Sequence, residues 1–328
     1  MKTLVTGSAG HLGEALIRTL RATRNETIGL DIKPSPFTDL VGSISDRNDV
    51  RQAMAGVRTV FHTATLHKPH VATHSKSDFV ETNIQGTLVL LEEAVRAGVE
   101  SFVFTSTTSV FGDALRPPVS RPAAWVTEDV EPIPKNIYGV TKKAAEDFCE
   151  LFSRKHGLAC LVLRTSRFFP EEDDNSIVRS EFSGDNSKAS EFLFRRVELQ
   201  DVVTAHLLAA ERASEIGFGC YIISATTPFS PQHLARLRTD APAIVGELFP
   251  DFSEVYGSRG WRMFPGIDRV YVNEAARTNL GWSPKYDFAR LLACLKEGRD
   301  WRSPIAIAVG SKGYHDVKYE DGPYPVES

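Results

Sequence analysis

The stretch Lys2-Thr3-Leu4-Val5-Thr6-Gly7-Ser8-Ala9-Gly10-His11-Leu12-Gly13 decides how this chain folds. A short apolar run leads into glycines spaced GxxGxxG, and an amphipathic segment over 12–22 follows. This order is typical of a strand, a tight loop and a helix whose N-terminus can receive a diphosphate, because side chains at the close-packed glycines would collide. A simple tight turn is the plainer alternative. We expect a dinucleotide to bind at Gly7, Gly10, His11, Leu12 and Gly13.

The second predicted strand ends on an acidic residue, Asp31, after Ile28-Gly29-Leu30. A carboxylate at this position accepts hydrogen bonds from the adenosine ribose hydroxyls and repels a 2′-phosphate. The sequence therefore predicts NAD rather than NADP as the cofactor, although Lys33 slightly weakens that preference.

Short apolar runs alternate with longer amphipathic segments through the first half of the chain. The predicted strands are 3–6, 27–30, 57–62, 101–106 and 159–163, and the predicted helices are 12–22, 46–55, 78–97 and 138–156. Apolar runs without alternation indicate strands that are covered on both faces, hence a parallel sheet. The predicted fold class is α/β, with a doubly wound parallel sheet of the Rossmann type.

The regularity fades after Pro170, where an irregular polar stretch runs to about Lys188. A helical pattern at 199–212 and a buried strand at 219–224 indicate a return to the sheet. We expect an NAD-binding domain over 1–169, its sheet continued by about 197–226. Residues 170–196 and 227–328 are then a smaller, discontinuous α/β substrate-binding domain. We expect an extended C-terminal segment from Ser303 onward.

The composition fits a globular protein with a small-molecule partner. The 328 residues are 42% hydrophobic and 24% charged with a net charge of −4, so we expect no nucleic acid and no membrane as partners. The cysteines, Cys149, Cys160, Cys220 and Cys294, lack CxxC spacing and are expected to be reduced thiols. The first strand begins at residue 2, and no apolar stretch approaches the roughly 20 residues of a membrane span. A cytoplasmic location is therefore expected.

Tyr138-Gly139-Val140-Thr141-Lys142 places a tyrosine and a lysine one helical turn apart. Since an unperturbed tyrosine has a pKa of about 10, it needs a nearby cation to act as a base at neutral pH. Lys142 lies on the same helix face and can supply that charge, and it can also hold the nicotinamide ribose. Alone, the pair could be incidental on an exposed helix; the preceding glycine loop favours an acid/base role.

Five consecutive hydroxyl residues, Thr105-Ser106-Thr107-Thr108-Ser109, follow the buried run Phe102-Val103-Phe104. The carboxyl end of a strand is where an α/β sheet forms its ligand crevice. Hydroxyl groups there can bind a substrate alcohol, whereas a Ser/Thr-rich turn is the structural alternative.

With these motifs the chain resembles, over about residues 1–300, the extended short-chain dehydrogenases/reductases of the NAD-dependent epimerase/dehydratase family, nucleotide-sugar epimerases in particular. The matching segments are the 6–13 loop, Phe61-His62-Thr63-Ala64-Thr65, Asn83 with Gly86-Thr87, 105–112 and 138–142. The resemblance implies that Thr107, Tyr138 and Lys142 are catalytic. It implies a homodimer packed through the helices at 78–97 and 138–156. The cofactor contacts that it implies, beside those of the glycine loop and Asp31, are Ser43, Ile44, Thr63, Ala64, Thr65, Asn83, Thr105, Tyr138 and Lys142.

Departures from the family pattern concern the substrate, for which Thr107, Thr108 and Arg167 are the candidate contacts. Thr108-Ser109 stand where the sugar dehydratases carry Asp-Glu, and neither can protonate a leaving hydroxide, so dehydration is disfavoured. The family's decarboxylases, with Glu in place of Ser109, are disfavoured as well. Arg167 replaces a usual asparagine and can bind either a diphosphate or a carboxylate. Ser43 replaces an aspartate, so one adenine hydrogen bond is altered.

The predicted function is that of an NAD-dependent oxidoreductase or epimerase acting on a secondary hydroxyl of a sugar or sugar derivative by tyrosine-assisted hydride transfer. A sugar-acid dehydrogenase is the alternative, because both reactions share the first half-reaction. A non-enzymatic NAD-sensing regulator is disfavoured by the presence of Thr107, Tyr138 and Lys142 together.

Three further features are given no catalytic role. His67, His70 and His74 fit no common metal-ligand spacing, so we expect no metal and assign them to a polar active-site loop. The acidic run over 171–174 is interpreted as a solvated loop or a helix start. Arg195-Arg196 is interpreted as a surface pair, with contact to an anionic substrate as the alternative.

Overall fold

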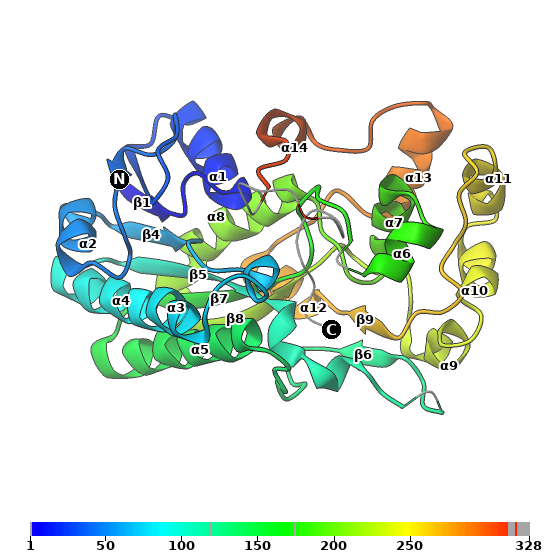
Figure 1. Ribbon diagram of the computed structural model, residues 1–328, viewed down its shortest axis with the longest axis horizontal. Coiled ribbons are helices and arrows are strands. Elements are labelled where there is room, and N and C mark those ends of the chain that lie inside the picture. The colour runs from blue at the N-terminus through cyan, green and yellow to red at the C-terminus, as the bar shows by residue number, and fades with distance from the viewer. Residues whose placement is uncertain (1, 119, 174, 314–318, 320–328) are drawn as a thin grey trace.

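A seven-stranded parallel sheet forms the centre of the larger part of the molecule in the computed structural model, which describes residues 2–118, 120–173, 175–313 and 319 (Figure 1). The strand order is β3-β2-β1-β4-β5-β7-β8. This confirms the predicted doubly wound α/β fold. The strands are β1 (Thr3–Thr6), β2 (Thr27–Asp31), β3 (Leu40–Val41), β4 (Thr59–His62), β5 (Ser101–Thr107), β7 (Cys160–Thr165) and β8 (Phe218–Ile223).

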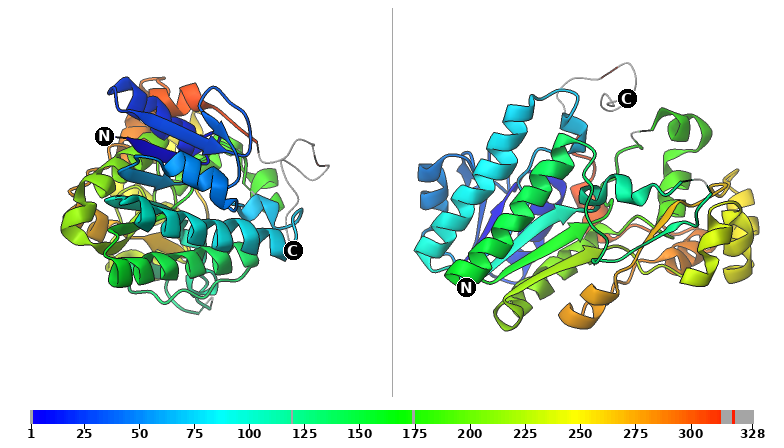
Figure 2. Two further views of the ribbon diagram at one scale, coloured as in Figure 1. Left: turned by 90° about the vertical axis from the view of Figure 1, so that its left-hand side faces the viewer. Right: turned by 90° about the horizontal axis from the view of Figure 1, so that it is seen from below.

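Helices cover both faces of this sheet, which Figure 2 shows from two further sides. One face carries α2 (Arg47–Met54), α4 (Gly86–Ala97) and α5 (Ile137–His156), and the other carries α1 (His11–Ala22) and α8 (Leu199–Ile216). Successive strand residues point to opposite faces: Leu4 packs toward α2 and α4, whereas Val5 packs toward α1 and α8. Because both faces are buried, the central residues of the strands are apolar at successive positions rather than at alternate ones.

Strand β1 lies between β2 and β4, and the chain builds the sheet outward from β1 in both directions. In open α/β sheets the ligand crevice forms outside the carboxyl ends of the strands where the strand order reverses. The segments that follow β1, β4, β5 and β7 are therefore placed around one common space.

A separate hydrophobic cluster lies beyond the carboxyl ends of the strands, at the right of Figure 1. It includes Phe192, Leu237, Ile244, Tyr256 and Phe288. The two-stranded sheet of β6 (Ala124–Val126) and β9 (Arg269–Tyr271) adds Val270 to this cluster, and Ala123, directly before β6, also belongs to it. Its helices are α6 (Ser176–Glu181), α7 (Gly184–Glu191), α9 (Leu234–Leu237), α10 (Ala241–Leu248), α11 (Phe252–Gly257) and α13 (Phe288–Lys296). The domain boundaries themselves stay a prediction.

Two segments are more regular than predicted. The stretch after Pro170 was expected to be irregular but contains α6 and α7, which are capped by the side chains of Asn175 and Ser183. The segment after Ser303 was expected to be extended but begins with α14 (Pro304–Val309), whose Ser303 cap accepts a hydrogen bond from the Ala306 N–H. These helices are too short for a clear hydrophobic period, so only their capping residues could have indicated them.

The predicted helix at 78–97 is divided into three parts. It comprises α3 (Lys76–Phe79), a π-helical stretch (Val80–Gln85) and α4. The remaining helix, α12 (Glu274–Leu280), packs on α8 and β8. The cysteines Cys149, Cys160, Cys220 and Cys294 are all free. Within the described ranges no helix combines the length and the apolar character that crossing a bilayer requires.

Candidate active site

A cavity of about 1540 Å³ opens at the carboxyl ends of the central strands. Two predicted site residues, Asn83 and Lys142, do not line this cavity and lie behind its wall, each 2% exposed. The other predicted residues all line it: Gly7, Gly10, His11, Leu12, Gly13, Asp31, Ser43, Ile44, Thr63, Ala64, Thr65, Thr105, Thr107, Thr108, Tyr138 and Arg167.

The glycine loop is packed so tightly that side chains are excluded. A Cβ atom on Gly13 would lie 2.0 Å from the Gly7 carbonyl oxygen, and one on Gly7 would lie 2.7 Å from the Ala64 amide nitrogen. Helix α1 begins directly after Gly10, so the N–H groups of its first turn lack helical partners and can bind an anion. The shape of the loop therefore fits the diphosphate of a dinucleotide.

Asp31 is fixed at the end of β2 by two backbone amides. Its Oδ2 accepts a hydrogen bond from the Ala9 N–H at 2.9 Å, and its Oδ1 accepts one from the Lys33 N–H at 2.8 Å. A carboxylate has about four lone-pair sites, so acceptor capacity is left for ribose hydroxyls. Asp31 thus joins the glycine loop to the position expected for the adenosine ribose.

The side chains of Tyr138 and Thr107 lie close together at the cavity wall. Thr107 ends β5, and Tyr138 lies in the first turn of α5, whose N-cap Asn136 accepts a hydrogen bond from the Gly139 N–H at 3.0 Å. Burial raises the pKa of Tyr138 to about 12, and the nearby Thr107 hydroxyl acts in the opposite direction. The phenol is therefore protonated at neutral pH unless positive charge is brought near it.

Lys142 supplies a buried cation on the same helix. Its Nζ donates a hydrogen bond to the Thr105 carbonyl oxygen at 2.7 Å and lies 4.0 Å from the centre of the Phe104 ring. Burial lowers the pKa of Lys142 to about 7, while the charge of Glu146 opposes that shift. Lys142 thus contacts the backbone of β5, the strand that carries the hydroxyl residues Thr105, Ser106 and Thr107.

Asn83 lies in the π-helical stretch and joins three segments of the site. Its Nδ2 donates to the Thr141 hydroxyl and to the Leu66 carbonyl oxygen, each at 3.1 Å, and its Oδ1 accepts from the Thr65 hydroxyl at 2.9 Å. Local π-helical turns are frequent at functional sites because they redirect one side chain. Here the turn brings the Asn83 amide between α5 and the loop after β4.

Two buried histidines that the sequence did not single out orient hydroxyl groups of the site. His206 Nδ1 lies 2.8 Å from the Val202 carbonyl oxygen and must donate to it, so Nε2 accepts from the Thr105 hydroxyl at 2.8 Å. Burial lowers the pKa of His206 to about 4, which keeps the ring neutral. His62 similarly bridges the Thr6 and Thr87 hydroxyls at 2.8 and 2.9 Å. No local motif marks His206, whereas His62 lies within the matching segment Phe61-His62-Thr63-Ala64-Thr65.

The outer part of the cavity wall is rich in positive charge. Arg167 and Arg195 both approach Oδ2 of Asp173, at 2.5 and 3.3 Å. Burial lowers the pKa of Lys68 to about 7, and the charges of Lys135 and Arg167 add to that effect. The basic residues lining this region are Lys68, Arg116, Lys135, Arg167, Arg179, Arg195 and Arg269.

Two expectations about charged residues are wrong. Arg195 and Arg196 are not a surface pair, because Arg196 is 3% exposed and both bind the buried Glu191, at 2.8 and 2.9 Å. The acidic run is not simply solvated either, since Glu171 and Asp173 are buried. Their partners lie on distant segments of the chain, which no local sequence pattern reveals.

The histidine-containing loop lines the cavity as predicted, with a short 3₁₀ helix at Lys68–His70. The ring centres of His67 and Tyr138 lie 6.3 Å apart. The His67 N–H donates to His70 Nδ1 at 2.9 Å. No group of three or more His, Cys, Asp or Glu side chains suited to a metal ion occurs in the described parts of the chain.

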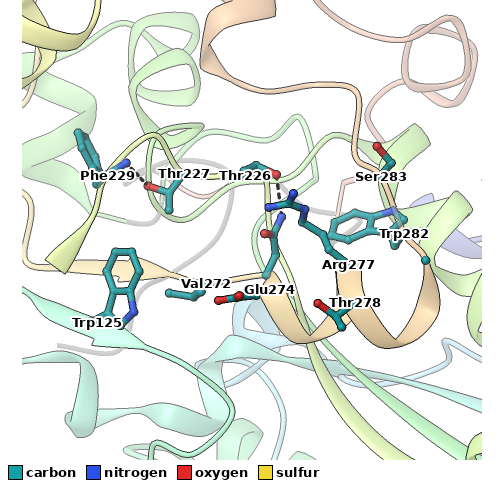
Figure 3. A pocket seen from close by; sticks show the side chains of 12 residues that line it. Trp125, Thr226, Thr227, Phe229, Val272, Glu274, Arg277, Thr278, Trp282 and Ser283 are labelled. Carbon is teal, nitrogen blue, oxygen red and sulfur yellow. Dashed lines mark hydrogen bonds between the residues drawn. The ribbon is translucent and has the colours of Figure 1, made fainter.

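A smaller hollow of about 630 Å³ lies between β6, the segment after β8 and α12 (Figure 3). Trp125 and Phe229 line one end of it, and Trp282 lies at the other. It contains neither the glycine loop nor the pair of Tyr138 and Thr107. The larger cavity is therefore the candidate active site.

The fold and the glycine loop define a dinucleotide-binding α/β protein. Residues 3–217 match the NAD dependent epimerase/dehydratase family, and the chain belongs to that family. The predicted family and the predicted cofactor, NAD, are confirmed.

Relatives within this family differ in their described substrates. An uncharacterized UDP-glucose epimerase of Bacillus subtilis is 30% identical over 185 residues, which cover 50% of this chain and 55% of the relative. A 3-beta-hydroxysteroid dehydrogenase of Mycolicibacterium neoaurum is 29% identical over 345 residues, covering 90% of both chains. The chain spans 39% and 55% of the lengths of the first two curated relatives that it matches.

Solved structures share the architecture. A short-chain dehydrogenase/reductase superfamily protein from Agrobacterium tumefaciens, with bound NAD, superposes with a TM-score of 0.64 at 23% identity. The match covers 91% of this chain and 98% of that protein. At this identity the likeness establishes the fold.

Proposed function

We propose that this protein is an NAD-dependent oxidoreductase or epimerase that acts on a secondary hydroxyl of an anionic sugar derivative. The observation that carries this proposal is the pair of Tyr138 and Thr107, whose neighbouring side chains line the same cavity as the glycine loop. A proton carrier beside a dinucleotide crevice is what conversion of an alcohol to a ketone requires. Family membership supports it.

Tyr138 takes the hydroxyl proton in this mechanism, and Thr107 orients the alcohol oxygen by its own hydrogen bond. Lys142, protonated, lowers the pKa of the tyrosine from behind the wall and so favours the phenolate. NAD, when bound, accepts the hydride from the substrate carbon and can return it. The His206 ring accepts a hydrogen bond from the Thr105 hydroxyl, which leaves the Thr105 oxygen free to accept a further hydrogen bond.

The charge of the cavity supports an anionic substrate over a sterol. A steroid would bury its rings against apolar side chains, whereas the outer wall carries seven Lys and Arg residues: Lys68, Arg116, Lys135, Arg167, Arg179, Arg195 and Arg269. Arginine side chains bind phosphate and carboxylate oxygens through two parallel N–H groups. A nucleotide sugar, as in the description of the Bacillus relative, suits this wall.

A sugar-acid dehydrogenase is the second candidate, and one contact favours it. Arg167 and Arg195 meet on a single carboxylate, that of Asp173. A substrate carboxylate could take the same position without a nucleotide. An NAD-sensing regulator would not need the buried arrangement of Tyr138, Thr107 and Lys142.

One experiment tests these alternatives together. The nucleotide that copurifies with the protein is identified first, and then sugars, sugar acids and nucleotide sugars are assayed for NADH absorbance and for epimerised product. An epimerase retains NAD and turns over without added cofactor, whereas a dehydrogenase forms NADH in proportion to product. No turnover with any member of the panel would contradict both enzyme assignments.

We also propose a homodimer in the cytoplasm. The helices expected to form the dimer carry exposed apolar residues, with Val80 44%, Val140 47% and Leu151 38% exposed. A dimer that packs through them would cover this apolar surface. Light scattering after size exclusion tests it: Val140→Glu should yield a monomer, and a dimer unaffected by that change would contradict this interface.

A further inference from the structure

The segment Ser311–Gly313 lies against the glycine loop, although some 300 residues of sequence separate the two. The Lys312 N–H is 3.1 Å from Nε2 of His11, the first residue of α1. The Lys312 ammonium forms an ion pair with Glu14, one turn further along the same helix. Lys312 and Gly313 line the large cavity together with Gly7, Gly10 and Gly13.

Glu171 anchors this segment. Its Oε1 accepts hydrogen bonds from the Ser311 hydroxyl at 2.7 Å and from the Lys312 and Gly313 N–H groups, each at 3.2 Å. The same oxygen lies 3.0 Å from His11 Nε2. Burial alone would raise the pKa of Glu171, but its contacts with His11 and Ser311 hold it at about 2, so the carboxylate is ionised at working pH.

These contacts form a closed arrangement around the start of α1. Glu171 follows β7, His11 begins α1, and Ser311–Gly313 follows α14, so three distant segments meet at one carboxylate. The helix N-terminus here is the end that fits a diphosphate. The Lys312 ammonium offsets the charge of the buried Glu14, which would otherwise place unpaired negative charge near the end of α1 where the cofactor diphosphate is expected.

We infer that Ser311–Gly313 is part of the NAD site: Glu171 holds the segment in place, and Lys312 positions the cofactor diphosphate at the start of α1. Lys312 and Gly313 of this segment form part of the wall of the cofactor crevice. Lys312 is thus a positioning residue for the cofactor, and it has no part in proton or hydride transfer. This role is independent of which alcohol the protein oxidises.

Two single substitutions in the full-length chain test the inference through NAD binding. Lys312→Ala removes the charge, and Ser311→Ala removes one bond to Glu171. The matched control is Lys296→Ala on α13, whose exposed side chain pairs with Asp251. We expect Lys312→Ala to raise the Kd for NAD about tenfold, mainly through faster dissociation, and Ser311→Ala to raise it by a smaller factor.

The readouts separate cofactor positioning from a purely structural role. With NAD removed, the unfolding temperatures of Lys312→Ala and Lys296→Ala should stay close to that of the wild type, while only Lys312→Ala weakens NAD. A double variant with Ser311→Ala should weaken NAD by less than the product of the single effects, because both changes act on one segment. An unchanged Kd for NAD in Lys312→Ala would overturn the inference.

Hydrogen exchange gives a test that needs no substitution. Binding equilibria are reciprocal, so if the segment stabilises bound NAD, then NAD must stabilise the segment. Saturating NAD should slow exchange of the Lys312 and Gly313 amides several-fold relative to the NAD-free protein. Exchange at these amides that is unaffected by NAD, while the glycine loop becomes protected, would contradict a cofactor role. Both tests measure NAD binding, so their outcome does not depend on the identity of the proposed substrate.

Discussion

The Lys142 ammonium donates a hydrogen bond to the Thr105 carbonyl oxygen at 2.7 Å. This bond holds a buried cation against the backbone of β5. The same strand ends at Thr107, which lies beside Tyr138. Burial of a charge costs free energy that a solvent-exposed lysine would not cost. If Lys142 lowers the pKa of Tyr138 as we propose, its burial exchanges stability for the acidity of that tyrosine.

The burial of Lys142 predicts that the free energy of unfolding depends on pH. The pKa of Lys142 falls from 10.5 to about 7 on folding, so the unfolded chain binds more protons between these values and stability rises with pH through that window. Below pH 7 Lys142 is protonated in both the folded and the unfolded chain, so the full free-energy cost of burying its charge is present. Lys142→Met should therefore raise the free energy of unfolding at pH 6, by roughly 1–3 kcal/mol after loss of the hydrogen bond, and the gain should shrink by pH 10.

Urea unfolding at both pH values measures this effect. The neighbouring Lys143→Met is the control, because Lys143 is partly exposed and pairs with Asp147. It should show little dependence on pH. A Lys142→Met protein that is equally destabilised at pH 6 and pH 10 would show that the hydrogen bond to Thr105 outweighs the cost of burial. Turnover should fall in Lys142→Met regardless of stability.

Tyr138→Phe separates proton transfer from cofactor binding. Removing the phenol oxygen leaves the ring packing intact but eliminates the group that takes the substrate proton, so kcat should fall by about 10²–10⁴. The Kd for NAD, measured by titration, should change less than twofold. Tyr286→Phe, a half-buried tyrosine outside the cavity lining, serves as the control. Unchanged turnover in Tyr138→Phe would refute its role as the acid/base.

The sequence predicts those features that depend on local order along the chain. The sheet and the glycine loop follow from apolar runs and from steric requirements that a few neighbouring residues satisfy, as at Gly7 and Gly13. The roles of Glu171 and Arg195 could not be predicted, because their partners, such as His11 and Asp173, come from other segments. A charged residue in a polar stretch is usually solvated, and only the tertiary structure shows that these are not.

The π-helical stretch is a second feature that could not be predicted from the sequence. The apolar spacing of 78–97 fits a continuous helix, and the hydrogen-bond shift that redirects Asn83 leaves no mark in that spacing. Asn83 was expected to contact the cofactor but lies 2% exposed behind the wall, bonded to Thr65, Leu66 and Thr141. Its role as a cofactor contact stays a prediction.

Arg167 is expected to act on substrate affinity. Arg167→Ala should raise KM for an acidic or nucleotide substrate by at least tenfold, and leave KM for an uncharged sugar nearly unchanged, because a bidentate charged contact is lost. Arg167→Lys should recover only part of the affinity, since lysine keeps the charge but lacks the planar pair of donors. Arg212→Ala, an exposed residue on α8, is the control. If KM for the acidic substrate does not change in Arg167→Ala, the proposal that Arg167 binds an anionic group of the substrate is wrong.

Gly13→Ala should abolish NAD binding, whereas the same change at Gly257 should be harmless. Both glycines lie in helices, where alanine is intrinsically favoured by about 1 kcal/mol. At Gly257 nothing lies within 4 Å of the added methyl group, so Gly257→Ala should keep or slightly raise the unfolding temperature. At Gly13 the methyl group would lie 2.0 Å from the Gly7 carbonyl oxygen, which forces the loop away from α1. NAD titration and thermal unfolding of the two variants check this, and NAD binding by Gly13→Ala with wild-type affinity would contradict the assignment of the loop as the diphosphate site.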